Sequence, residues 1–78
     1  MRKIEFQKLQ EYISCLEDVH SSLQKMQDDE HVKFDNLPES LQYSSRGEEF
    51  ENIIECLGDA VTGVEDAIDA IEQITNRK

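Results

Sequence analysis

The fold is decided by residues 50–77, which read FENIIEC LGDAVTG VEDAIDA IEQITNR when they are divided into sevens. Four of the seven columns hold apolar or small residues, and the other three hold nearly all the charge. Apolar residues three and four apart predict an amphipathic α-helix, here from about residue 45 to about residue 76. The four columns are Phe50, Leu57, Val64 and Ile71; Ile53, Ala60, Ala67 and Ile74; Ile54, Val61, Ile68 and Thr75; and Cys56, Gly63 and Ala70.

The apolar stripe of this helix is too wide for one partner helix. A two-stranded coiled coil needs only two apolar columns, so four columns indicate more than one neighbour. Small side chains at residues 56, 60, 63, 67 and 70 would let a partner helix approach closely. We therefore expect homo-oligomerisation, as a dimeric four-helix bundle or a larger assembly.

A second amphipathic helix is predicted from about residue 4 to about residue 29. Its expected seam, with Ile13 beside it, is Leu9, Tyr12, Leu16, Val19, Leu23 and Met26. Between the helices, a polar stretch around Pro38 (about 30–44) predicts an ordered connecting loop, anchored by Val32, Phe34, Leu37 and Leu41. The fold class that follows is all-α: an antiparallel helical hairpin forming one domain over residues 1–78.

The second helix has a start signal. Ser45 as the N-cap and Glu48 three residues later fit a capping box, in which each side chain bonds the other residue's backbone N–H. Free N–H groups and the helix dipole also favour an anion at such an end.

The residues around this helix start suggest a ligand site for a phosphate that carries a base. Ser44 and Arg46 would contact the phosphate, and Tyr43 offers a face on which a base stacks. Asn36 and Gln42 could hydrogen-bond the edge of that base. The alternative is that capping and intrahelical pairing occupy all of these groups.

Composition narrows the choice of partners. The 78 residues include 18 Asp or Glu and 8 Lys or Arg, for a net charge of −10 at pH 7. Such a chain would be repelled by bare nucleic acid and by anionic membranes, and no apolar run reaches the length of a membrane span. Two cysteines, Cys15 and Cys56, are too few for a disulfide framework and indicate reduced thiols in a cytoplasm.

A row of carboxylates on the outer side of the second helix forms what we call the acidic ridge: Glu51, Glu55, Asp59, Asp66 and Asp69. It would either solubilise an otherwise apolar helix or imitate a phosphate backbone and bind a basic protein.

Catalysis and metal binding find little support. The chain has no nucleophile elbow, zinc-protease motif, phosphate-binding loop or paired Cys-x-x-Cys. Glu17 and His20 form a Glu-x-x-His motif of the kind used in di-metal bundles, but the apolar columns of the second helix supply no carboxylate to complete it. We expect no enzyme activity, no metal and no cofactor.

The connection and the second helix resemble a known group of proteins. Residues 36–42 read NLPESLQ, Ser44 or Ser45 with Arg46, Gly47 and Glu48 follow, and acidic heptads such as 64–72 come next. This pattern, over about 36–74, is similar to small acidic helical proteins of phages and prophages of Gram-positive bacteria. The resemblance implies an accessory phage protein in the host cytoplasm. Such proteins often blunt host defence, by sequestering nucleotide immune signals or by binding or imitating a macromolecule.

Three functional hypotheses follow. The first is a non-enzymatic, phage-type binding protein that counteracts host antiviral defence by sequestering a cyclic or other small nucleotide at an oligomer interface. The second is an acidic inhibitor or DNA mimic that binds a basic host protein through the acidic ridge. The third is a purely structural helical bundle module.

Overall fold

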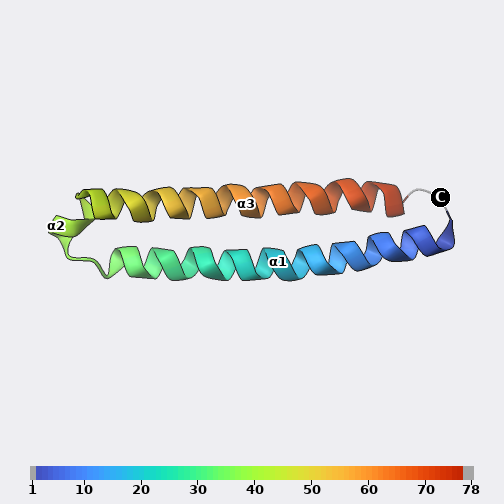
Figure 1. Cartoon of the computed structure of the whole chain (residues 1–78), viewed down its shortest axis with the longest axis horizontal. Coiled ribbons are helices and arrows are strands. Elements are labelled where there is room, and N and C mark those ends of the chain that lie inside the picture. Colours follow the sequence, from blue (N-terminus) through green and yellow to red (C-terminus); the bar gives the residue numbers. More distant parts are fainter. Residues whose placement is uncertain (1, 77–78) are drawn as a thin grey trace.

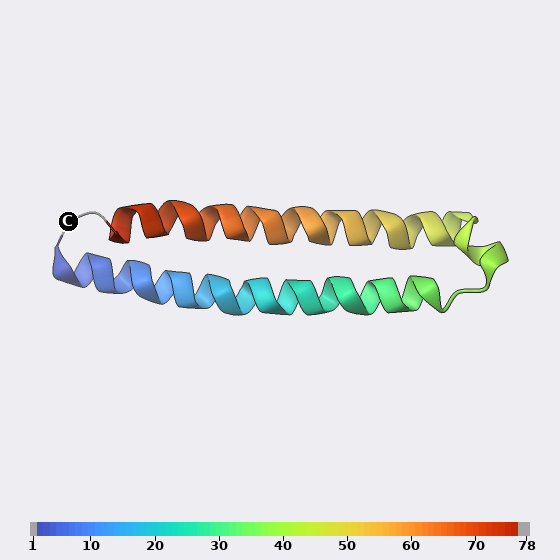
Figure 2. The same cartoon turned by 180° about the vertical axis from the view of Figure 1, so that it is seen from behind.

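The computed structural model describes residues 2–76 of the chain (Figure 1). Helix α1 runs from Lys3–Asp35, the single turn α2 from Glu39–Gln42, and α3 from Ser45–Thr75. Figures 1 and 2 show α1 and α3 side by side and antiparallel, with α2 at the end where the chain reverses. The described residues contain no strand, so the predicted all-α helical hairpin is confirmed.

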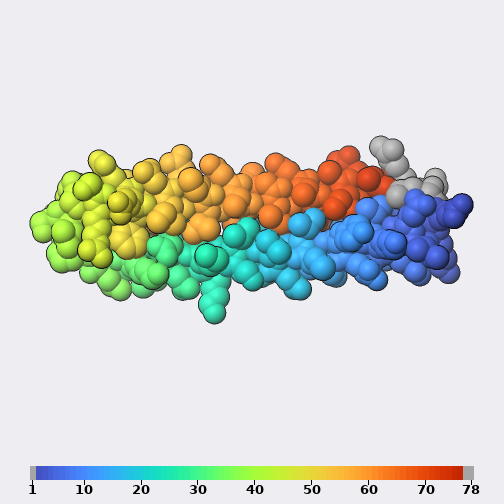
Figure 3. All heavy atoms as spheres, viewed as in Figure 1, coloured from blue at the N-terminus to red at the C-terminus, as the bar shows by residue number. Residues whose placement is uncertain are grey.

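The hairpin is a rod of 58 × 14 × 13 Å with a radius of gyration of 17.6 Å. A compact domain of this length has a radius of gyration of about 11.5 Å. Figure 3 shows α1 and α3 in contact along the rod. Two helices cannot surround a side chain from all sides, and among the apolar residues of the described part only Val61 is buried, at 7% exposure. No helix in residues 2–76 has both the length and the hydropathy to cross a membrane.

The helices pack through one heptad seam from each. On α3 the seam consists of the first and fifth columns, from Phe50 and Ile54 onward, which are half-buried or buried. On α1 the half-buried positions follow the same spacing of three and four residues. They are Phe6, Leu9, Ile13, Leu16, His20, Leu23, Gln27, Glu30 and Phe34.

The predicted seam of α1 was therefore only half right. Leu9, Leu16 and Leu23 are half-buried as expected, whereas the other column of the prediction is exposed. On the surface of α1 the column of Leu9 lies between the column of Tyr12 and the column of Ile13. It forms a heptad stripe with either of them. Helix α1 packs on α3 through its leucine column and its Ile13 column, which together include three polar residues. The more apolar Tyr12 column is exposed.

The polar seam residue Gln27 makes a specific contact across the hairpin. Its Nε2 donates a hydrogen bond to the carbonyl oxygen of Ile54, at 3.2 Å. Gly58 leaves room for this side chain, because a Cβ at that position would lie 3.0 Å from Gln27 Nε2. A half-buried hydrogen bond of this kind favours one register over its neighbours.

Helix α1 ends six residues later than predicted, at Asp35 instead of about Asp29. Phe34 continues the inward seam, and Lys33 bonds Glu30 at 3.0 Å in the last turn. The helix stops just before Leu37, whose backbone is restricted by the following Pro38. Of the four expected anchors of the connection, Phe34 and Leu37 are half-buried, but Val32 and Leu41 are exposed, so those two were predicted wrongly.

The start of α3 is displaced by one residue from its prediction. Ser44 is the N-cap: its Oγ accepts a hydrogen bond from the backbone N–H of Arg46 at 3.3 Å. Ser45 is the first helical residue, so the predicted capping box of Ser45 with Glu48 does not form. Gly47 fixes this register, because it is buried against the backbone of Gln42 and a Cβ there would overlap the Gln42 carbonyl group.

Candidate functional site

A stripe of large apolar side chains is exposed along α1. Tyr12, Val19 and Met26 are 52%, 46% and 54% exposed. They are seven residues apart, and seven residues complete almost two turns of helix, so the three side chains lie in one row. Isolated exposed apolar residues are ordinary, but a row of them along a helix indicates a contact surface.

A second stripe runs along α3 and is made mostly of small residues. It joins the fourth and seventh columns of the repeat and contains no charged residue. Ile53 and Ile74 are exposed at its two ends, and at Gly63 in the middle a Cβ would meet no other atom within 4 Å. The stripe consists of Ile53, Cys56, Ala60, Gly63, Ala67, Ala70 and Ile74.

The two stripes lie on the same side of the hairpin. An α-helix has 3.6 residues per turn, so the Tyr12 column of α1 points about 80° away from the direction of α3. The Ile53 column of α3 points about 80° away from the direction of α1, and both rotations have the same sign when each helix is viewed from its N-terminus. Because the helices face each other and run antiparallel, equal rotations bring both columns to one side. We call the combined surface of these two stripes the apolar face.

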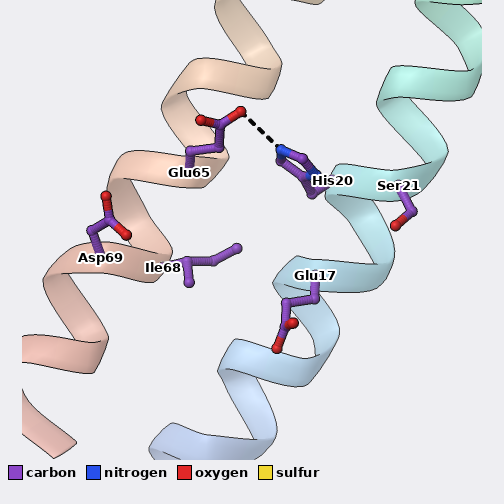
Figure 4. Close-up of a pocket in the computed structure, with 6 residues that line it drawn as sticks. All are labelled: Glu17, His20, Ser21, Glu65, Ile68 and Asp69. Atoms are coloured by element: carbon purple, nitrogen blue, oxygen red, sulfur yellow. Dashed lines mark hydrogen bonds and ion pairs between the residues drawn. The ribbon is translucent and has the colours of Figure 1, made fainter. Parts of the chain in front are cut away.

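The opposite side of the hairpin is polar. Its shallow hollow is lined by Glu17, His20, Ser21, Glu65, Ile68 and Asp69 (Figure 4). His20 Nε2 lies 2.9 Å from Glu65 Oε1, and Figure 4 shows this as the one bond joining the drawn residues. Within residues 2–76 there is no group of three or more potential ligands that could hold a metal ion. Of the Glu17–His20 motif, His20 makes a bond between the helices, to Glu65.

The five residues predicted to bind a ligand are brought together, but three of them serve the turn itself. Asn36 caps α1. Gln42 Nε2 donates to the carbonyl oxygens of Phe34 and Leu37, at 3.3 and 3.1 Å. Ser44 caps α3, and its Oγ also donates to the Leu41 carbonyl at 2.6 Å. The bonds of Gln42 and Ser44 use side-chain groups that a base or phosphate would need.

The other two predicted ligand residues point outward. Tyr43 is 84% exposed, and Arg46 is exposed at the start of α3. Arg46 borders a shallow hollow, whose lining also includes Ser45, Glu49, Phe50 and Ile53. Glu49 places a negative charge beside Arg46, which weakens the attraction of this hollow for an anion.

The acidic ridge is solvated, as all five of its carboxylates are exposed. The ion pairs of the described residues involve Glu65 and Glu30, neither of which belongs to the ridge. The ridge lies on α3 outside the apolar face, and its residue Asp69 also lines the hollow shared with α1.

Comparison with protein-family models, with curated proteins and with solved structures finds no match to this chain. In the sequence, the α3 part of the apolar face is visible as the surplus columns of the repeat, whereas the α1 row is predicted to face α3.

Proposed function

We propose that this chain is a non-enzymatic helical interaction module, which acts by packing its apolar face against another helical surface. This corresponds to the third of the hypotheses from the sequence, a bundle-forming structural protein. The observation that supports it is the continuous uncharged surface formed by the two stripes, on a hairpin that buries a single apolar side chain among its described residues. Apolar burial is the main favourable term in helix packing, so this face is where binding energy is available.

The polar turn between α1 and α3 holds the two helices in place. It reverses the chain within a few residues and closes on itself through the hydrogen bonds of Gln42 and Ser44. A self-contained turn holds α1 and α3 antiparallel and keeps both stripes on one side. The residues of this turn thus shape the proposed binding face.

A pair of matched variants tests this proposal. Ala60→Glu places a charge in the middle of the apolar face, whereas Thr62→Glu places the same charge at an exposed position of α3 outside it. Both positions are exposed in the isolated hairpin, where such substitutions change stability by about 0.5 kcal/mol at most. Sedimentation velocity and circular dichroism compare the association and helix content of the two variants.

We expect Ala60→Glu to lose association, or to lose helix content if folding depends on the contact, while Thr62→Glu behaves like the unchanged chain. Equal behaviour of the two variants, both associated and helical, would show that the apolar face has no partner and would overturn the proposal.

Nucleotide sequestration is a second candidate, supported by the exposed pair of Tyr43 and Arg46 beside the start of α3. It requires the turn to bind a small nucleotide without breaking its own hydrogen bonds. Native mass spectrometry of the protein purified from cells with active nucleotide signalling would detect a retained ligand. If Arg46→Ala retains the same amount of nucleotide, the site is not at this turn, and if no nucleotide is found this candidate is rejected.

Binding of a basic host protein through the acidic ridge is a third candidate. All five ridge carboxylates are exposed, and none of them takes part in an ion pair among the described residues. Such binding would weaken steeply as salt increases. Replacing the five ridge residues by Asn and Gln should abolish it, whereas Ala60→Glu should leave it intact.

A further inference from the structure

We propose that the partner of the apolar face is a second copy of this chain, arranged so that α1 of each copy lies on α3 of the other. The two copies are then related by a two-fold axis parallel to the helices, and every helix has antiparallel neighbours. The inference rests on the proposed function, since it names the occupant of the same face.

The exposed area of the hairpin matches what a homodimer would bury. The chain exposes 6036 Å², whereas a compact monomer of 9.0 kDa exposes about 4,850 Å². The surplus is about 1,200 Å² per chain, so a pair that removed it would bury about 2,400 Å² in total. Homodimers that fold only as dimers bury about 2,000–5,000 Å². The hairpin therefore has enough surplus surface for such an interface.

The apolar face is complementary to itself in side-chain size. Its α1 stripe has large side chains at Tyr12, Val19 and Met26, and its α3 stripe has small ones between Ile53 and Ile74. Large side chains pack best against small ones on the facing helix. A two-fold axis parallel to the helices brings each large row onto the small row of the other copy, whereas an axis perpendicular to them would place large on large.

The register inside one hairpin sets the register between copies, because rotation about a parallel axis keeps every residue at its height. The bond between His20 and Glu65 shows that these two residues lie at about the same height in the hairpin. Val19 of one copy then lies at the level between Gly63 and Ala67 of the other. This level is nearer to Ala67 than to Gly63, so the valine packs beside Ala67, and the glycine, where a Cβ would meet no other atom within 4 Å, leaves open space next to it.

Charge favours the same pairing. Helix α3 carries nine acidic residues and one basic residue, for a net charge of −8. Helix α1 carries eight acidic and four basic residues, for a net charge of −4. Placing the two α3 helices on a diagonal of the bundle separates the two most negative elements, whereas stacking α3 on α3 would bring them into contact. The uncharged apolar face lets the copies meet without burying a carboxylate.

Disulfide trapping between single-cysteine chains tests the pairing. Cys15 and Cys56, both free and exposed, are first replaced by alanine. Val19→Cys is made in one chain and Ala67→Cys in another chain of different mass, so that no disulfide can form within a chain. The two are unfolded together, refolded as a mixture and oxidised. Sedimentation equilibrium under reducing conditions checks that each variant is still a dimer of about 18 kDa, twice 9.0 kDa.

We expect the mixed disulfide between Val19→Cys and Ala67→Cys as the main product. Each variant alone should give almost none, because diagonal helices lie well beyond the Cα separation of about 7 Å that a disulfide can bridge. Efficient linkage of Val19→Cys to itself would overturn the pairing in favour of α1 on α1. A dimer without any linkage would overturn it as well. A mass of 9.0 kDa would reject the second copy while leaving the proposed module free to bind a different helix.

Discussion

Gly47 and Gly63 occupy the same helix, and replacing each by alanine should change stability in opposite directions. At Gly47 a Cβ would overlap the carbonyl group of Gln42, so the turn must shift. The shift puts at risk the two hydrogen bonds of the Gln42 side chain and the cap made by Ser44. Each is worth about 1 kcal/mol, so a loss of about 2–3 kcal/mol is expected. The higher helix propensity of alanine returns about 0.5–1 kcal/mol, which leaves a net loss of about 2 kcal/mol.

Gly63→Ala is the matched control. In the hairpin a Cβ at Gly63 meets nothing within 4 Å, so only the gain of about 0.5–1 kcal/mol in helix propensity remains. A partner helix over Gly63 would reduce this gain.

Urea unfolding followed by circular dichroism, at one protein concentration, measures both changes. In a thermal scan of a domain of this size, a loss of about 2 kcal/mol in the free energy of unfolding would lower Tm by about 10 °C. If Gly47→Ala were as stable as the unchanged chain, the close packing of Gly47 on Gln42 would not exist and the described turn would be incorrect.

Three further predictions concern the seam and the surface charge. Val61→Ala should lower the free energy of unfolding by about 2 kcal/mol, because it empties a buried position, whereas Thr62→Ala beside it should change it by about 0.5 kcal/mol at most; urea unfolding compares the two. His20→Leu should leave stability unchanged or raise it by about 1 kcal/mol, since the exposed bond to Glu65 is weak and leucine suits the seam; a large loss would show that this bond is essential. Tm should rise as salt is increased from about 10 mM to about 300 mM, because the −10 charge repels itself, and a chain with the acidic ridge neutralised should show a smaller rise in the same scan.

The helices could be predicted because their signals are strong and local. The regular heptads of α3 indicated both its existence and its inward columns, and the structure has both. The width of the stripe also predicts more than one neighbour for α3, which stays a prediction. These properties depend on residue spacing alone, which the sequence displays directly.

The α1 seam could not be predicted, because its leucine column belongs to two competing stripes. Apolar character alone predicts that the stripe with Tyr12, Val19 and Met26 faces the other helix of the pair. The structure instead turns His20 and Gln27 toward α3, where each finds a hydrogen-bond partner on that helix. Such partners depend on the register between the helices, which residue spacing in one helix does not contain.

The predicted ligand residues illustrate a second limit. The polar side chains of Gln42 and Ser44 were visible in the sequence, but their partners were not. In the structure these side chains cap α3 and close the turn. A polar loop beside a helix start is consistent with either role until its hydrogen bonds are known.

The molar mass of the unchanged chain in solution, measured by sedimentation equilibrium together with Tm over a hundredfold range of protein concentration, tests the self-association of the apolar face most directly. We predict a mass of about 18 kDa, twice the 9.0 kDa of one chain, and a Tm that rises with concentration, because folding and association are linked. A mass of 9.0 kDa with a Tm independent of concentration would contradict it, since the hairpin would then be stable with its apolar face uncovered.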